Sequence, residues 1–127
     1  ARVRYAKQDM PVIVAEIDHR RWADALATWV GTAAPTEGSP PQLSHHACRF
    51  GRWCEGQGQV RYGDLVAFQG IAPIHVRIHT LARELATLKM AGQGEQAILR
   101  LAEFQAAHDG LMDQLDRLRN SIANNHP

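Results

Sequence analysis

The spacing of apolar residues is the feature that most constrains how this chain can fold. In the last third of the chain, seven positions recur at strictly alternating intervals of three and four, which places them on one side of an α-helix. They are Leu101, Phe104, His108, Leu111, Leu115, Leu118 and Ile122. The same alternation runs through residues 12–29 and 71–88. Three such stretches predict long helices that bury these faces against one another in a bundle.

The segments between these stretches carry helix-breaking residues. Gly31 is expected to end the first helix, and residues 31–47 hold three prolines and no apolar periodicity, which predicts a long loop. Residues 48–55 are expected to form a short helix or a turn, and the glycine-rich residues 56–63 to be irregular. Residues 120–127 are expected to fray. We therefore predict an all-α fold.

The expected architecture is an antiparallel four-helix bundle with a short Cys-bearing helix and a long Pro/Gly-rich loop. Its 127 residues suit a single domain spanning residues 1–127. The formal net charge is +1, which argues against nucleic acid or an anionic membrane as a partner. No apolar run approaches the ~20 residues of a membrane span. The two cysteines, Cys48 and Cys54, are too few for a secreted disulfide scaffold, so we expect thiols in the cytoplasm.

Histidine is abundant in this chain, with seven residues, and three of these lie where metal ligands would be placed. His75 and His79 are four residues apart and share one helical face, while His19 lies on the apolar stripe of the first helix. Cys48 lies in a short segment beside aromatic residues. Imidazole and thiolate are the ligands of tetrahedral zinc sites, so His19, Cys48, His75 and His79 together predict such a site.

Each of these four side chains also has an ordinary structural interpretation. A histidine pair is often at the surface, a core histidine is often satisfied by hydrogen bonds, and a lone cysteine often packs as a small apolar residue. His45, His46 and Cys54 are competing ligands because they lie close to Cys48 in the sequence. His108 is interpreted as a core histidine, and it is the reserve ligand if one of the four is wrong.

Three motifs in fixed order strengthen the zinc prediction. They are His19-x-x-Trp22, then Cys48-Arg-Phe-Gly51-Arg-Trp53, then His75-x-x-x-His79. In these motifs the chain resembles the bacterial chemoreceptor zinc-binding domain family, over roughly residues 10–120. The resemblance implies that the matching three histidines and one cysteine hold zinc, in a helical bundle that often pairs as a homodimer. It also implies a regulatory module of a chemoreceptor or of an enzyme that makes cyclic di-GMP.

The ligand set itself favours regulation over catalysis. Four protein ligands leave no open position on zinc for water, and the chain lacks the His-Glu-x-x-His pattern of zinc hydrolases, so we do not expect an enzyme. We expect Cys48 to be the mobile ligand, and its oxidation is a possible second input. A carboxylate is expected to orient one imidazole. The candidates are Glu16, Asp18, Asp64 and Glu84.

Two alternatives remain beside a zinc-responsive domain that controls an attached output domain. One is a dimerisation bundle in which zinc is purely structural. The other is an iron- or haem-binding bundle, which the absence of carboxylates from the predicted buried faces disfavours. A homodimer and a covalently attached signalling domain are the expected partners.

Overall fold

The structure is a computed structural model, and it describes residues 9–31 and 49–124. These residues form three long helices, α1 (Asp9–Gly31), α5 (Ile71–Met90) and α6 (Gly94–Asn124). Between α1 and α5 lie four short elements. They are α2 (Arg49–Trp53), the π-helix η1 (Cys54–Gly58), α3 (Gln59–Tyr62) and α4 (Val66–Gln69). No strand occurs within the described ranges, which confirms the predicted all-α fold.

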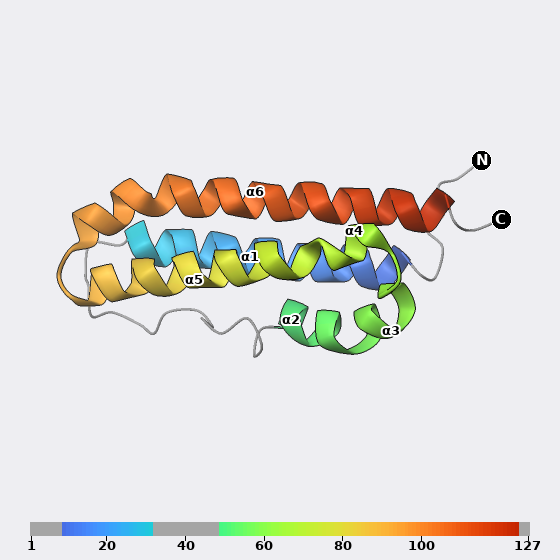
Figure 1. Cartoon of the computed structure of the whole chain (residues 1–127). Helices are drawn as coiled ribbons and strands as arrows, with labels where there is room; N and C mark the ends of the chain where they lie inside the picture. The colour runs from blue at the N-terminus through green and yellow to red at the C-terminus, as the bar shows by residue number, and fades with distance from the viewer. Residues whose placement is uncertain (1–8, 32–48, 125–127) are drawn as a thin grey trace.

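The long helices lie side by side, and the short helical segment 49–62 completes a bundle of four packed helices (Figure 1). α1 and α5 run in the same direction, whereas α6 and segment 49–62 run in the opposite one. Helices that follow one another along the chain are therefore antiparallel, as their loops predict. α6 packs against both α5 and α1, and α2 packs against α1.

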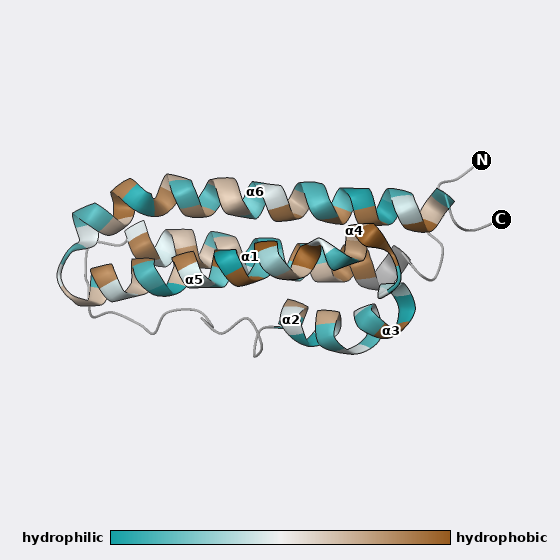
Figure 2. Ribbon diagram, in the orientation of Figure 1, coloured by the Kyte–Doolittle hydropathy of each residue, from teal (hydrophilic) through white to brown (hydrophobic). Residues whose placement is uncertain are grey.

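The buried face of each long helix follows the predicted period. Figure 2 shows hydrophobic and hydrophilic residues alternating along each of them, as expected of helices with one face in the core. On α6 the buried side chains are Ala97, Phe104, His108, Leu111, Leu115, Leu118 and Ile122. On α5 the buried face is wider than the predicted apolar seam, because it also includes His75, His79, Ala82 and Ala86.

Two local predictions about helix ends are wrong. Fraying from residue 120 is not observed, because α6 continues to Asn124 and Ile122 is buried against the core. The prediction of an irregular segment over residues 56–63 is wrong for residues 57–62, which are helical, while Gly56, with a φ of −106° and a ψ of −107°, makes a kink. Gly58 allows this segment to pack closely, since a Cβ there would lie 3.0 Å from Phe68 Cε1. Tertiary packing here overrides the local preference of glycine.

The turn between α5 and α6 contains Gly92, whose φ of +82° is one that glycine adopts readily. The described part of α1 reaches Gly31, and the residues that follow lie outside the described ranges, so the predicted helix end there stays a prediction. Lys89, near the end of α5, is buried, and its ammonium group donates a hydrogen bond to the carbonyl oxygen of Trp29 in the last turn of α1. The same ammonium lies 4.8 Å from the centre of the Trp29 ring. This contact joins the ends of α1 and α5.

In the described part of the chain, none of the helices combines the length and the apolar character that crossing a bilayer requires.

Candidate metal centre

Three histidines from two helices converge in the core. α1 supplies His19, and α5 supplies His75 and His79 from successive turns of one face. Their exposed fractions are 2%, 3% and 0%, and one ring nitrogen from each lies within 4.8 Å of the others. This arrangement can hold a metal ion. The expectation that a histidine pair of this kind often lies at the surface does not apply to His75 and His79.

Aromatic side chains enclose the three imidazoles. Trp22, one turn after His19 on α1, stacks on His79 with 4.3 Å between ring centres. Phe50 on α2 presents its ring edge-to-face to both His19 and His75, at 5.0 Å from each. These rings keep water away from the cluster and restrict the rotation of the imidazoles.

Burial keeps His19 uncharged. Burial, followed by the neighbouring His75, His108 and His79, lowers the pKa of His19 from its ordinary value of 6.5 to about 2. His19 is therefore neutral at physiological pH and keeps a lone pair on one ring nitrogen. A neutral imidazole is the form that binds a metal ion.

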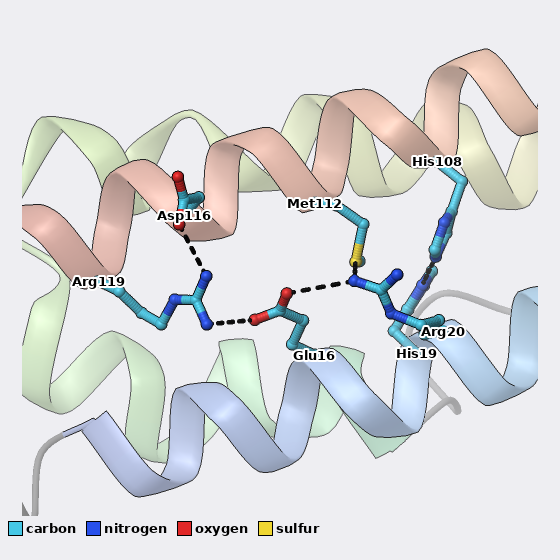
Figure 3. A network of polar contacts seen from close by, with 7 residues as sticks. All are labelled: Glu16, His19, Arg20, His108, Met112, Asp116 and Arg119. Carbon is cyan, nitrogen blue, oxygen red and sulfur yellow. Dashed lines mark hydrogen bonds and ion pairs between the residues drawn. The ribbon is translucent and has the colours of Figure 1, made fainter. Parts of the chain in front are cut away.

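The two ring nitrogens of His19 have different surroundings. Nδ1 lies 3.0 Å from Nε2 of His108 on α6, in a buried hydrogen bond (Figure 3). Nε2 is buried and has no hydrogen-bond partner among the described residues. A buried polar atom without a partner is costly unless another ligand meets it, so Nε2 is the atom of His19 that is available to a metal ion.

A chain of charged contacts between α1 and α6 lies beside this hydrogen bond. Figure 3 shows Glu16 accepting contacts from Arg119, at 3.0 Å, and from Arg20, at 3.4 Å. Arg20 also contacts the sulfur of Met112, and Arg119 pairs with Asp116 at 2.8 Å. These contacts hold the two helices in register next to His19.

The partner of His19 Nδ1 is the imidazole of His108 and not a carboxylate. Of the candidate carboxylates, Asp18 pairs with Arg49 and Glu84 pairs with Arg100. The sequence predicted His108 as a core histidine and a reserve ligand, not as the hydrogen-bond partner of His19. The only signal that could have found its role was its place on the buried stripe of α6.

The remaining predicted residues fall into two groups. Cys48, His45 and His46 lie outside the described residues, so the ligand role of Cys48 stays a prediction. Cys54 is half-buried and packs against the hydrophobic core in η1. The structure therefore brings together three of the four predicted ligands, and it adds His108 as the neighbour of one of them.

Comparison with known proteins agrees with this arrangement. The chemoreceptor zinc-binding domain matches residues 19–86, which is more than half of the chain. The protein belongs to this family. It is a family of regulatory zinc-binding domains rather than of catalytic ones. No curated protein and no solved structure matches the chain.

The chemoreceptor zinc-binding domain match begins at His19 and includes His75 and His79. It ends at Ala86, so Lys89, His108 and the whole of α6 lie beyond it. The contact between His19 and His108 is thus a feature of this chain that the family match does not cover.

Proposed function

We propose that this chemoreceptor zinc-binding domain holds one zinc ion and uses it to regulate an attached signalling domain. The proposed ligands are His19, His75, His79 and Cys48. One observation carries the proposal, the convergence of three buried imidazoles within 4.8 Å in a chain of this family. Nitrogen and sulfur are the ligand atoms that zinc prefers, and a bound zinc ion would link the helices that supply them.

The three histidines of the described part of the chain have the chemistry and spacing that zinc binding requires. Within residues 9–31 and 49–124, Nε2 of His19 is buried without a hydrogen-bond partner, and the low pKa of this imidazole keeps it in the metal-binding form. Tetrahedral ligation at about 2.1 Å separates neighbouring ligand nitrogens by about 3.4 Å, so small rotations of the rings would close the set around one ion. With four protein ligands the ion would have no open position for water, so we propose no catalytic role.

Contacts on both residues that follow Cys48 support it as the fourth ligand. Arg49 pairs with Asp18, which is adjacent to His19, at 3.4 Å. Phe50 lies 5.0 Å from the rings of His19 and His75. These contacts bring the start of α2 to the imidazoles, and this supports the proposal that Cys48 is a ligand.

Zinc would couple α1, α5 and the start of α2, and this coupling is the proposed basis of regulation. The histidines sit on long, packed helices, whereas α2 has only five residues. Loss of the thiolate, by release of zinc or by oxidation of Cys48, would loosen α2 first. The attached domain would respond to that change. A chemotaxis receptor and a cyclic di-GMP synthase are the proposed outputs.

We also propose a cytoplasmic homodimer. α1 exposes Val14 and Ile17, which are three residues apart and share one face of the helix. Apolar residues on one face of a long helix suit a second copy of the chain. Light scattering on the purified domain tests this, and a monomer at micromolar concentration would exclude it.

The zinc site is tested by elemental analysis of purified protein, with variants of one predicted ligand of each type. We expect about one zinc per chain in the wild type, and a large loss of zinc in His79→Ala and Cys48→Ala. Cys54→Ala is the matched thiol control and should retain zinc. A wild type that retains no zinc after dialysis against a zinc buffer would exclude the proposed function. Equal zinc content in Cys48→Ala and Cys54→Ala would exclude Cys48 as a ligand.

A dimerisation bundle with purely structural zinc is the second candidate function. Hydrogen exchange of residues 49–62 with and without zinc separates the two. Regulation requires that protection in this segment falls when zinc is removed under native conditions. A segment equally protected in both states would favour the structural role.

A further inference from the structure

His108 lies beyond the family match and makes a polar contact of 3.0 Å with a predicted zinc ligand, His19. We propose that His108 is a positioning residue, which accepts a hydrogen bond from Nδ1–H of His19 and so presents Nε2 of His19 to the metal. This inference rests on the proposed zinc site. It goes further by assigning a role to α6, which supplies none of the four predicted ligands.

The direction of the hydrogen bond follows from the chemistry of imidazole. A neutral imidazole carries one proton, and the nitrogen that binds a metal must be the one without it. If Nε2 of His19 binds the metal, the proton is on Nδ1, which then donates across the 3.0 Å contact to Nε2 of His108. His108 must in turn carry its own proton on Nδ1. A metal-bound histidine almost always donates its second N–H to an acceptor, most often a carboxylate, a backbone carbonyl or water, and here Nε2 of His108 would take that place.

Packing holds the ring of His108 in the orientation that this role requires. Its ring plane lies within 13° of that of His19, and its exposed fraction is 7%. Phe104, one turn earlier on α6, stacks beside it at 6.4 Å. An imidazole enclosed in this way cannot swing freely, so its Nε2 stays at hydrogen-bond distance from Nδ1 of His19.

A cavity of about 390 Å³ between α1 and α6 is lined by His108. Its lining also includes the charged residues Arg20, Asp24 and Asp109. The second nitrogen of His108 therefore need not lie in an apolar environment when it carries the proton. The surroundings of both histidines therefore suit the proposed tautomers, in which His19 and His108 each carry the proton on Nδ1.

Two substitutions at position 108 distinguish the role of His108 as a hydrogen-bond acceptor from its role in filling space in the core. His108→Gln keeps an acceptor oxygen near the place of Nε2, whereas His108→Leu keeps apolar bulk and removes the acceptor. Gln105→Ala is the control, because Gln105 lines the same cavity but is exposed. Zinc affinity is measured by competition with a chromophoric chelator, and circular dichroism verifies that each variant is folded.

We expect His108→Leu to bind zinc about 10- to 100-fold more weakly than the wild type, the usual effect of losing such a partner. His108→Gln and Gln105→Ala should stay within about threefold of the wild type. Wild-type affinity in His108→Leu would overturn the inference. An equal loss in His108→Gln and His108→Leu would also overturn it, because the lost property would then be the ring and not the acceptor.

A spectroscopic measurement tests the hydrogen bond without using affinity. In protein with ¹⁵N-labelled histidine, NMR should show the proton of His19 on Nδ1 and slow in exchange with water, both with zinc and without it. His108→Leu should accelerate that exchange. A proton found on Nε2 of His19 would contradict the inference. Failure of zinc to bind the wild type would instead contradict the proposed function, so the two failures can be told apart.

Discussion

Acid should destabilise the metal-free protein through His19. In the unfolded chain this imidazole takes up a proton as the pH falls through about 6.5. In the folded protein, burial beside three other imidazoles lowers its pKa to about 2, so it stays neutral across the same range. The unfolded state therefore binds more protons below pH 6.5. The stabilising contribution is present above that pH and is lost as the pH falls.

The size of this effect can be worked from the shift. Between about pH 7.5 and about pH 5, one histidine kept neutral in the folded state and free to titrate in the unfolded state lowers the free energy of unfolding by about 2 kcal/mol. Burial also lowers the pKa of His108, which acts in the same direction. Urea unfolding in the presence of a chelator, at several pH values, measures the total.

The variant His19→Gln isolates the contribution of His19. Glutamine retains a donor and an acceptor but does not titrate, and all other histidines remain in both proteins. We expect the free energy of unfolding of the wild type to fall by about 2 kcal/mol more than that of the variant over this pH range. If the two proteins lose stability equally, the burial of a neutral His19 is not the cause, and the reasoning fails.

Three further predictions concern stability and can be checked by urea unfolding of the chelator-treated protein. Lys89→Met should lower the free energy of unfolding by about 1–2 kcal/mol, because it removes the hydrogen bond and the cation–π contact to Trp29 at the end of α1; an unchanged value would show that the contact contributes nothing. Gly58→Ala should cost about 1–3 kcal/mol, since the added Cβ would lie 3.0 Å from both Phe68 Cε1 and the carbonyl oxygen of Trp53. Gly110→Ala should instead raise stability by about 0.5–1 kcal/mol, because it lies inside α6 with no atom within 4 Å of the new Cβ; a loss there would mean that α6 needs flexibility at this position.

Local sequence signals account for the helices but not for every turn between them. The alternating apolar spacing predicted α1, α5 and α6. The glycines of residues 56–63 led to the wrong prediction of an irregular segment. The close packing of Gly58 against Phe68 and Trp53 stabilises a helical conformation that the local sequence disfavours. Interactions between distant segments cannot be weighed from local composition.

The candidate metal site was also predicted only in part from the sequence. The spacing of four between His75 and His79 determines that they share a helical face, since this follows from the geometry of one helix. Their burial, and the approach of His19 from α1, depend on how α1 and α5 pack.

By itself, the sequence determined which residues lie on which face of each helix, because the helical period depends on the backbone alone. Only the tertiary structure decided the rotation and register of the helices against one another. That register places His108 against His19, 89 residues away along the chain, and no periodicity within one helix encodes a contact between two.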